Sequence, residues 1–315
     1  MSNPSIETVN LTKHFNSFVA VSDVNLDIKG AKCVGLLGPN GAGKTTTLKM
    51  LTSLIRPSSG RALINGVDVN ENKREALKST GALIETPEIY PSLTPREALM
   101  MIAKIRGVTK PQRSRLIEKA VANVRMEEWI DVKVGKFSKG MRQRICIASA
   151  LLNDPTVLLL DEPTIGLDPR GISEVRGIIK SLKGKNRLIL MSSHILSEVL
   201  DVCDFIAMID HGKLIVYDTI SNVTSKFSAG RIAIEIGLRQ PLNSLTLPKT
   251  IAAIPGVVAA ERIDEKSIRI DFDGGTDMQE RILADMVRMN IGVITCKPLS
   301  SGLEDAYLKL TEETV

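Results

Sequence analysis

The segment Gly38-Pro-Asn-Gly-Ala-Gly-Lys-Thr45 has the residue types and spacing of a loop that binds phosphate groups. It follows the apolar stretch Cys33–Leu37 and precedes leucines at helical spacing, which is the strand-loop-helix context that such a loop requires. Glycines let backbone N–H groups approach phosphate oxygens, and a helix start adds about half a positive charge. We therefore expect Lys44 to reach the β and γ phosphates of a nucleotide and Thr45 to bind Mg²⁺. The predicted nucleotide-binding residues of this segment are Gly38, Pro39, Asn40, Gly41, Ala42, Gly43, Lys44, Thr45 and Thr46.

Two carboxylates follow an apolar stretch further along the chain, in Val157-Leu-Leu-Leu-Asp-Glu162. At the end of a strand beside the phosphate loop, Asp161 can hold Mg²⁺ directly or through water, and Glu162 can polarise the attacking water. Taken alone, the pattern fits a buried strand with an acidic exit into a loop equally well. Together with the upstream lysine and threonine, it favours a nucleoside triphosphatase.

The sequence disfavours a GTPase. A GTPase of this class needs an Asn-Lys-x-Asp string after the aspartate strand to recognise the base. The nearest string, Asn72-Lys-Arg-Glu75, precedes that strand and ends in glutamate.

Further motifs occur in a fixed order around the aspartate strand: Phe137-Ser-Lys-Gly-Met-Arg-Gln-Arg144, Leu160-Asp-Glu-Pro163, Gly166-Leu-Asp-Pro169 and His194. With the phosphate loop, they resemble the ATP-binding cassette (ABC) family in order and spacing, over about residues 5–217. The resemblance implies an ATPase with ATP and Mg²⁺ as cofactors. It also implies a dimer with two shared sites, and one chain that carries every motif can build a homodimer.

The resemblance assigns roles to single positions. Phe15 falls where the family stacks an aromatic ring on adenine. Ser138 and Gly140 fall where one subunit grips the γ-phosphate bound to the other, and Asp168 resembles the residue that links the two sites. His194 resembles the switch that contacts the γ-phosphate and joins Glu162 and Lys44 as a candidate catalytic residue; without the motif order, a single histidine after a strand would be a structural cap or an exposed polar residue.

Three positions depart from the family pattern. Glu85 stands where the family usually has the glutamine that senses Mg²⁺; a carboxylate can still bind the metal but adds negative charge beside phosphate. This substitution resembles the branch that exports lantibiotics and bacitracin-like peptides, although neutral drift explains it equally well. Lys139 replaces a glycine and Met141 a glutamine, which predicts slower or more partner-dependent turnover.

The resemblance also implies a membrane partner. Residues Glu88–Thr94 fall where the family docks a cytoplasmic helix of a separate transmembrane permease, although a proline-bounded turn explains the same residues. The C-terminal segment Leu303–Thr311 resembles the tail of ATPases that serve exporters, and its apolar residues also fit a plain amphipathic helix. We therefore expect an export ATPase at the cytoplasmic face of the membrane. The alternative is a soluble ABC ATPase that acts on ribosomes or DNA, which usually has two cassettes in tandem or a coiled-coil insertion.

The elements that must position these residues alternate between apolar strands and amphipathic helices from about Ile6 to Tyr217, as in an α/β fold with a mixed sheet. Val24, Leu26 and Ile28 alternate with Asn25 and Asp27 as in a half-buried strand of an antiparallel β subdomain. Cys33–Leu37, Val157–Leu160 and Leu188–Met191 read as buried strands. Helix signals dominate residues 86–136, beginning with a capping box at Thr94-Pro-Arg-Glu97. We expect a cassette domain over 1–220 with this helical insertion.

A second pattern begins after residue 220. Ile268, Ile270 and Phe272 alternate as in a strand, Met278 to Met286 have helical spacing, and Val293–Thr295 reads as a strand again. We expect a small α+β accessory domain over 221–315.

Composition agrees with a folded protein that has no membrane span of its own. Of 315 residues, 43% are hydrophobic and 24% charged, which is ordinary globular usage. The net charge of +5 arises in the first two-thirds of the chain and suits phosphate or anionic lipid as well as DNA. No nucleic acid is expected as partner, because the resemblance is to transporter subunits. The four cysteines are widely spaced and are expected to be reduced thiols, and no apolar run reaches the length of a membrane span.

Overall fold

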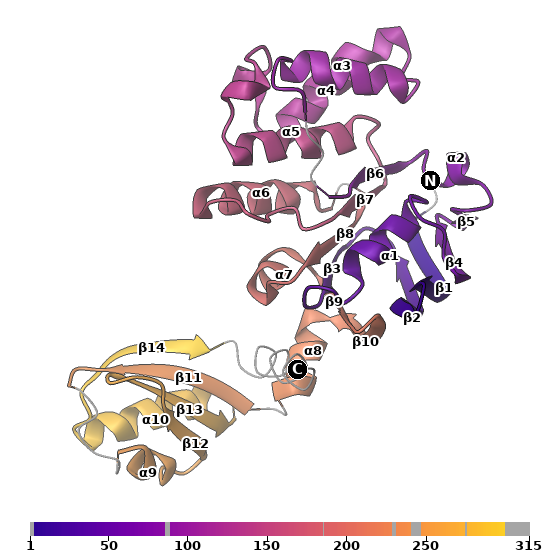
Figure 1. Cartoon of the computed structure of the whole chain (residues 1–315). Coiled ribbons are helices and arrows are strands. Elements are labelled where there is room, and N and C mark those ends of the chain that lie inside the picture. Colours follow the sequence, from indigo (N-terminus) through magenta and orange to yellow (C-terminus); the bar gives the residue numbers. More distant parts are fainter. Residues whose placement is uncertain are drawn as a thin grey trace. The chain divides into compact units, whose positions relative to one another are not determined.

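The computed structural model describes residues 3–85, 89–184, 186–228, 231–240, 247–274 and 276–299 (Figure 1). Its Cα atoms cluster into two compact units, Met1–Ile220 and Ser221–Val315. Each unit has an apolar core of its own and is described by itself.

A six-stranded sheet organises the first unit, in the order β10-β9-β3-β8-β7-β6. All neighbours are parallel except β10 and β9, which makes the sheet mixed as predicted. β3, β7 and β8 are buried along their whole length, as expected for strands covered on both faces. The strands are β3 (Cys33–Leu37), β6 (Thr80–Leu83), β7 (Val157–Leu160), β8 (Leu188–Ser193), β9 (Phe205–Asp210) and β10 (Lys213–Thr219).

An antiparallel sheet forms the predicted β subdomain, in the order β2-β1-β4-β5. In β2, Val24, Leu26 and Ile28 are buried while Asn25 and Asp27 are exposed, so that one face packs on the core. The buried faces of both sheets share one apolar core. The strands are β1 (Ser5–Phe15), β2 (Phe18–Lys29), β4 (Ser59–Ile64) and β5 (Val67–Asp68).

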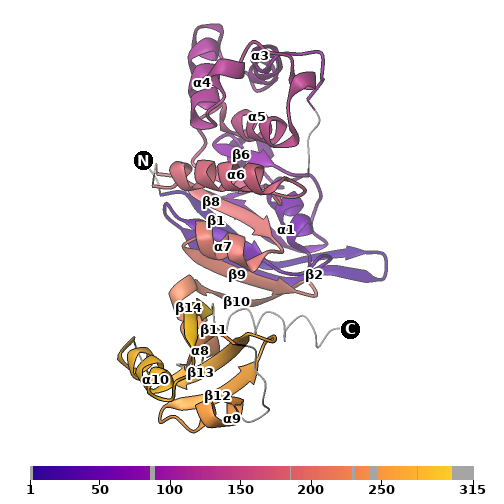
Figure 2. The ribbon, with the colours of Figure 1, turned by 90° about the vertical axis from the view of Figure 1, so that its left-hand side faces the viewer.

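The predicted helical insertion lies beyond β6, where α3, α4 and α5 pack together in both views (Figures 1 and 2). α3 begins with the predicted capping box, because Thr94 Oγ1 accepts from Glu97 N and Glu97 Oε2 accepts from Thr94 N. The helices of the first unit are α1 (Lys44–Leu51), α2 (Lys73–Ala76), α3 (Pro95–Ile105), α4 (Lys110–Asn123), α5 (Lys139–Leu151), α6 (Pro169–Leu182) and α7 (Leu196–Val202), with 3-10 turns at Glu127–Trp129 and Val134–Lys136. α8 (Ile220–Ser228) spans the boundary between the units.

The second unit has the order strand, helix, strand, strand, helix, strand, in an antiparallel sheet β12-β13-β11-β14. This is the connectivity of the split β-α-β arrangement. Ile268, Ile270 and Phe272 face the helices and are fully buried, which confirms the predicted strand. The elements are β11 (Arg231–Leu238), α9 (Leu247–Ala252), β12 (Val257–Arg262), β13 (Ser267–Asp273), α10 (Thr276–Arg288) and β14 (Val293–Leu299). The predicted C-terminal tail helix lies outside the described residues.

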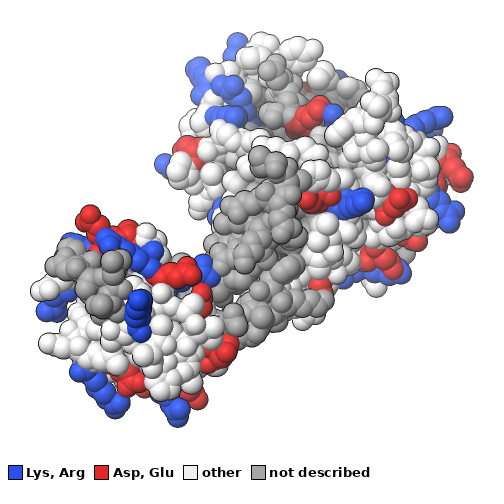
Figure 3. All heavy atoms as spheres, turned by 60° about the horizontal axis from the view of Figure 1, so that its bottom comes forward, with Lys and Arg blue, Asp and Glu red and all other residues white. Residues whose placement is uncertain are grey.

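The distribution of charge and the state of the cysteines can be compared with what the composition suggested. On the face visible in Figure 3, Lys and Arg side chains are interspersed with Asp and Glu on both units. All four cysteines are free thiols. Within the described ranges, the structure contains no helix of the length and apolarity that a membrane crossing demands.

Candidate functional site

The phosphate loop connects β3 to α1, and two of its glycines have no substitute. Gly43 has φ of 100°, and a Cβ there would lie 2.4 Å from the carbonyl oxygen of Ala20. A Cβ on Gly38 would lie 2.2 Å from the carbonyl oxygen of Ile209. Any larger residue would therefore displace the backbone that shapes the loop. Ala42 is buried and anchors the loop, because its carbonyl accepts from Gly212 N at 3.0 Å.

The remaining loop residues leave the rim of the site open. Asn40 and Gly41 are exposed, Pro39 is half-buried, and Thr45 and Thr46 lie half-buried in the first turn of α1. The first turn of this helix carries no acidic side chain, so its positive end is available to an anion.

Lys44 is buried inside the loop that it is predicted to serve. Its Nζ donates to the carbonyl oxygens of Gly38 at 2.7 Å and Pro39 at 2.9 Å, and lies 3.4 Å from Glu162 Oε1. Burial lowers the pKa of Lys44, and the carboxylate of Glu162 partly opposes that shift. The ammonium group therefore sits where phosphate oxygens can take over from carbonyls and a carboxylate as its acceptors.

The two carboxylates meet the loop at the carboxyl edge of the parallel sheet. Asp161 follows β7, and its Oδ1 accepts from Thr45 Oγ1 at 3.0 Å and from Ser192 Oγ at 2.7 Å. Ser192, at the end of β8, also accepts from Glu162 N at 2.8 Å. Sequence reasoning missed Ser192, although a pair of serines ending an otherwise apolar strand is a usable signal.

His194 closes the chain of contacts. Its Nδ1 lies 2.9 Å from Glu162 Oε2, and the donor depends on the tautomer of the ring. Glu162 has φ of 43°, in the left-handed region that few residues with side chains adopt. The structure therefore brings together the three predicted catalytic residues, with one oxygen of Glu162 facing Lys44 and the other facing His194.

A second cluster holds Ser138, Gly140 and Asp168 at the adjacent N-termini of α5 and α6. Ser138 caps α5 and accepts from Met141 N at 3.2 Å, while Asp168 caps α6 and accepts from Gly171 N at 3.3 Å. The two helix starts approach closely, since a Cβ on Gly140 would lie 3.4 Å from Gly171 Cα. Across the part of the chain that is described, no hydrogen bond or ion pair joins Ser138 or Asp168 to the phosphate loop.

Phe15 and Glu85 lie at the periphery of the site. Phe15 ends β1 at the β1-β2 hairpin, is 46% exposed, and has Lys13 Nζ 5.1 Å from its ring centre. Glu85 follows β6 with φ of 61°, and its Oε1 accepts from Lys49 Nζ at 2.5 Å. Of the three predicted metal ligands, Thr45 and Asp161 are thus in contact, whereas Glu85 is engaged by a lysine.

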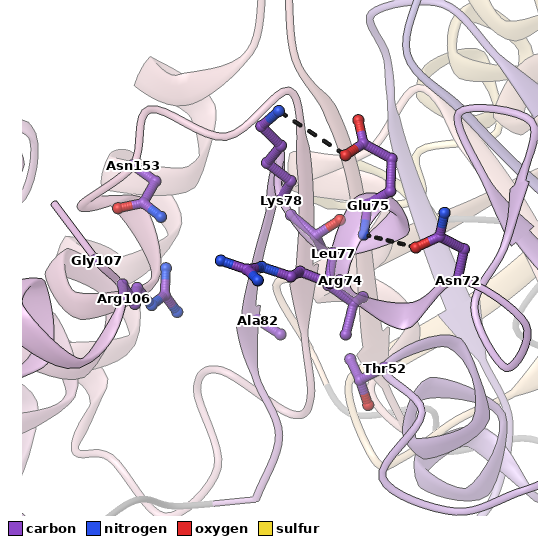
Figure 4. Close-up of a pocket in the computed structure, with 11 residues that line it drawn as sticks. Thr52, Asn72, Arg74, Glu75, Leu77, Lys78, Ala82, Arg106, Gly107 and Asn153 are labelled. Carbon is purple, nitrogen blue, oxygen red and sulfur yellow. Dashed lines mark hydrogen bonds and ion pairs between the residues drawn. The ribbon is translucent and has the colours of Figure 1, made fainter.

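A pocket of about 680 Å³ lies between α2, β6 and the end of α3 (Figure 4). Arg74, Lys78 and Arg106 line it with a single carboxylate, Glu75, which lies 3.8 Å from Lys78 Nζ. The guanidinium groups of Arg74 and Arg106 extend toward each other from opposite sides, and neither has an ion-pair partner among the described residues. Burial lowers the pKa of Arg106, so an anionic partner would be favoured here.

Comparisons with known proteins agree with this geometry. The sequence profile described as "ABC transporter" matches residues 21–165. The bacitracin transport ATP-binding protein BcrA of Bacillus licheniformis is 46% identical over 211 residues, which cover 67% of this chain and 68% of the relative. The ABC transporter ATP-binding protein YhcH of Bacillus subtilis is 34% identical over 98% of this chain and 96% of its own length. The lantibiotic transport ATP-binding protein SrtF of Streptococcus pyogenes is 39% identical over 70% of this chain and 94% of its own.

Solved structures share the fold of the first unit. An ATP-binding subunit of an ABC transporter superposes with a TM-score of 0.63 at 29% identity, over 71% of this chain and 93% of that one. A dimeric ATP-binding cassette bound to ADP and phosphate superposes with a TM-score of 0.61 at 22% identity, over 68% and 98% of the two chains.

Proposed function

This chain belongs to the ABC transporter family, as an ATP-binding subunit that hydrolyses ATP, and from this premise we propose that it drives export through a separate transmembrane permease. Two copies would close around two nucleotides, and hydrolysis would reopen them. The observation that carries the catalytic part is the row of contacts Lys44, Glu162, His194, in which both oxygens of Glu162 are occupied.

The row of contacts suggests how ATP activates the site. When phosphate oxygens replace Glu162 as the acceptor for Lys44, Glu162 Oε1 becomes free to accept a proton from water. The water oxygen then bonds to the γ-phosphorus while the bond to the bridging oxygen breaks, and ADP leaves with that oxygen. His194, held on Glu162 Oε2 at 2.9 Å, keeps the carboxylate oriented.

Mg²⁺ fits the donors that the site offers. Thr45 Oγ1 and Asp161 Oδ1 are hard oxygen donors 3.0 Å apart, and Mg²⁺ in such sites is held by one or two protein oxygens together with substrate phosphates. The ion would supply neutralisation of phosphate charge. Glu85 would bind the ion only after its carboxylate breaks the contact with Lys49.

A dimer would explain the second cluster. Ser138 and Gly140 stand at the N-terminus of α5 and make no hydrogen bond to the phosphate loop among the described residues, so the anion that this terminus suits would come from a second copy. Asp168 at the start of α6 would then lie at the same interface.

The permease would dock at the pocket of Figure 4 and the chain entering α3, and the subunit would lie at the cytoplasmic face of the membrane. Ile105 directly precedes the lining residue Arg106 and is 78% exposed, and Leu54 lies two residues after the lining residue Thr52 and is 60% exposed. Arg74 and Arg106 have no ion-pair partner among the described residues, and together with Lys78 they favour an acidic side chain on the incoming segment. Of the docking segment expected from sequence, Glu88 lies outside the described residues.

The test is affinity purification of tagged Glu162→Gln protein from native membranes in Mg-ATP, with bound proteins identified by mass spectrometry. A stoichiometric polytopic membrane protein supports the proposal. Reversing charge in the pocket with Arg74→Glu and Arg106→Glu should release that protein, whereas the surface control Arg262→Glu on the second unit should not. Ribosomal or DNA-bound proteins, with no membrane protein, would favour the soluble alternative.

The names of the relatives suggest a first class of cargo. BcrA and SrtF are named for bacitracin and lantibiotic transport, and the proposal extends this class, peptide antibiotics, to the present chain. Cells that lack the gene should become more susceptible to such peptides.

A further inference from the structure

One buried carboxylate outside the row of contacts touches both loops that carry catalytic residues. Glu198, on α7, is 1% exposed. Its Oε2 accepts from Thr164 Oγ1 at 2.8 Å and from Ser193 Oγ at 3.0 Å. Thr164 follows Glu162 by two residues, and Ser193 directly precedes His194. Glu198 therefore joins the loop after β7, which carries Glu162, to the last residue of β8, which directly precedes His194.

The other oxygen of Glu198 faces a single cation. Oε1 lies 3.5 Å from Arg176 Nη2 on α6, an ion-pair distance with no hydrogen bond to that oxygen. Arg176 also lies 3.8 Å from Asp201, so it is shared between two carboxylates. A buried carboxylate with two hydroxyl donors on one oxygen and no hydrogen bond on the other is costly to keep. An apolar side chain would fill the same space without the free-energy cost of a buried charge.

The loops that Glu198 joins need support from both sides. Glu162 has a left-handed backbone, which persists only where its surroundings hold it. Ser192 Oγ holds it from one side, through Glu162 N, and Thr164 is held from the other side by Glu198. Ser193 Oγ also accepts from Ile195 N at 3.0 Å, so its hydroxyl fixes the backbone on both sides of His194.

We propose that Glu198 is a positioning residue, which acts through Thr164 and Ser193 to hold Glu162 and His194 at hydrogen-bond distance. This inference rests on the catalytic roles proposed for those two residues. Misplacing a general base and its orienting partner by a fraction of an ångström slows chemistry without weakening nucleotide binding, which depends on the phosphate loop.

The test removes the two donors and leaves the carboxylate in place. The double variant Thr164→Val, Ser193→Ala should lower kcat about 10-fold and leave the KM for ATP within about twofold, because positioning acts on the chemical step. In ¹⁵N spectra of nucleotide-free protein, the Nδ1 signal of His194 should move toward that of an unbonded ring. Glu198→Gln, which keeps the shape of the side chain, should have an intermediate kcat.

The matched control is Thr8→Val, Ser181→Ala. The hydroxyls of buried Thr8 and exposed Ser181 donate to backbone carbonyls away from the site, at 2.9 Å to Val24 O and 2.7 Å to Ile178 O. This variant should keep kcat and the His194 signal. An unchanged kcat and an unchanged His194 signal in Thr164→Val, Ser193→Ala would overturn the proposal, as would equal losses in the control. Glu162→Gln, measured alongside, separates the two ideas: if it turns over normally, the catalytic assignment itself is wrong.

Discussion

At the scale of single residues, the reactive groups of the site contact one another and the backbone of the phosphate loop. Lys44 is satisfied by loop carbonyls and Glu162, and Thr45 is satisfied by Asp161. Each of these contacts ties up a group that the nucleotide or its metal would use. In the proposed mechanism, binding of Mg-ATP is therefore an exchange of partners for these groups.

The pair Lys49 and Glu85 leads to a prediction about charge. Lys49 stands one helical turn after Thr45, so its ammonium offsets the carboxylate that replaces the usual glutamine. Lys49→Met should weaken ATP affinity several-fold, and adding Glu85→Gln should restore it, because the unneutralised charge is then gone. Titration with a fluorescent ATP analogue, with and without Mg²⁺, measures this.

The control for that pair is Lys29→Met, which breaks an exposed ion pair with Asp27 of similar length, 2.7 Å, on β2. It should leave affinity unchanged. Because Glu85 is 66% exposed, Lys49→Met should change the free energy of unfolding by no more than about 1 kcal/mol. A double variant as weak as Lys49→Met alone would contradict the charge argument.

At the scale of elements, the sequence predicted the parts with strong local signals. β3 and β7 were expected with their observed bounds, because short apolar runs next to a phosphate loop and to paired carboxylates leave few alternatives. The capping box of α3 was also readable, since its two side chains bond backbone within four residues.

The side-chain contacts that the sequence did not predict join residues far apart in the chain. Ser192 reaches Asp161 because β7 and β8 are neighbours, and Glu198 reaches Thr164 because α7 packs near the same edge. The chain order of the strands does not reveal their order in the sheet. The Glu85 contact was missed for the same reason, because Lys49 and Glu85 are 36 residues apart.

The capping box leads to a prediction about the helical insertion. Thr94→Ala should lower the free energy of unfolding by about 1 kcal/mol, because it leaves an N–H at the start of α3 without its acceptor. Thr109→Ala is the matched control, since Thr109 caps α4 without a side-chain bond to the backbone. Urea denaturation compares the two, and equal losses would contradict the role given to the capping box.

At the scale of the whole molecule, the two units differ in the functional residues that they contain. The phosphate loop, both carboxylates and the helix starts that would face a partner all belong to Met1–Ile220. The second unit has its own buried core and contributes no residue to the described site. Catalysis should therefore be a property of the first unit. The relative YhcH aligns along 98% of this chain, so the alignment with it includes the second unit.

One experiment on the Glu162→Gln protein tests both the dimer and the catalytic assignment. It measures the mass of the protein in solution by light scattering in ATP and Mg²⁺, and its rate of phosphate release. We predict a dimer that forms only with ATP, and turnover at least about 100-fold below the parent chain. Ser138→Ala in the same background should return it to a monomer, because the contact across the interface is lost. A Glu162→Gln protein that releases phosphate at the parent rate, or that stays monomeric with ATP bound, would contradict the proposed mechanism.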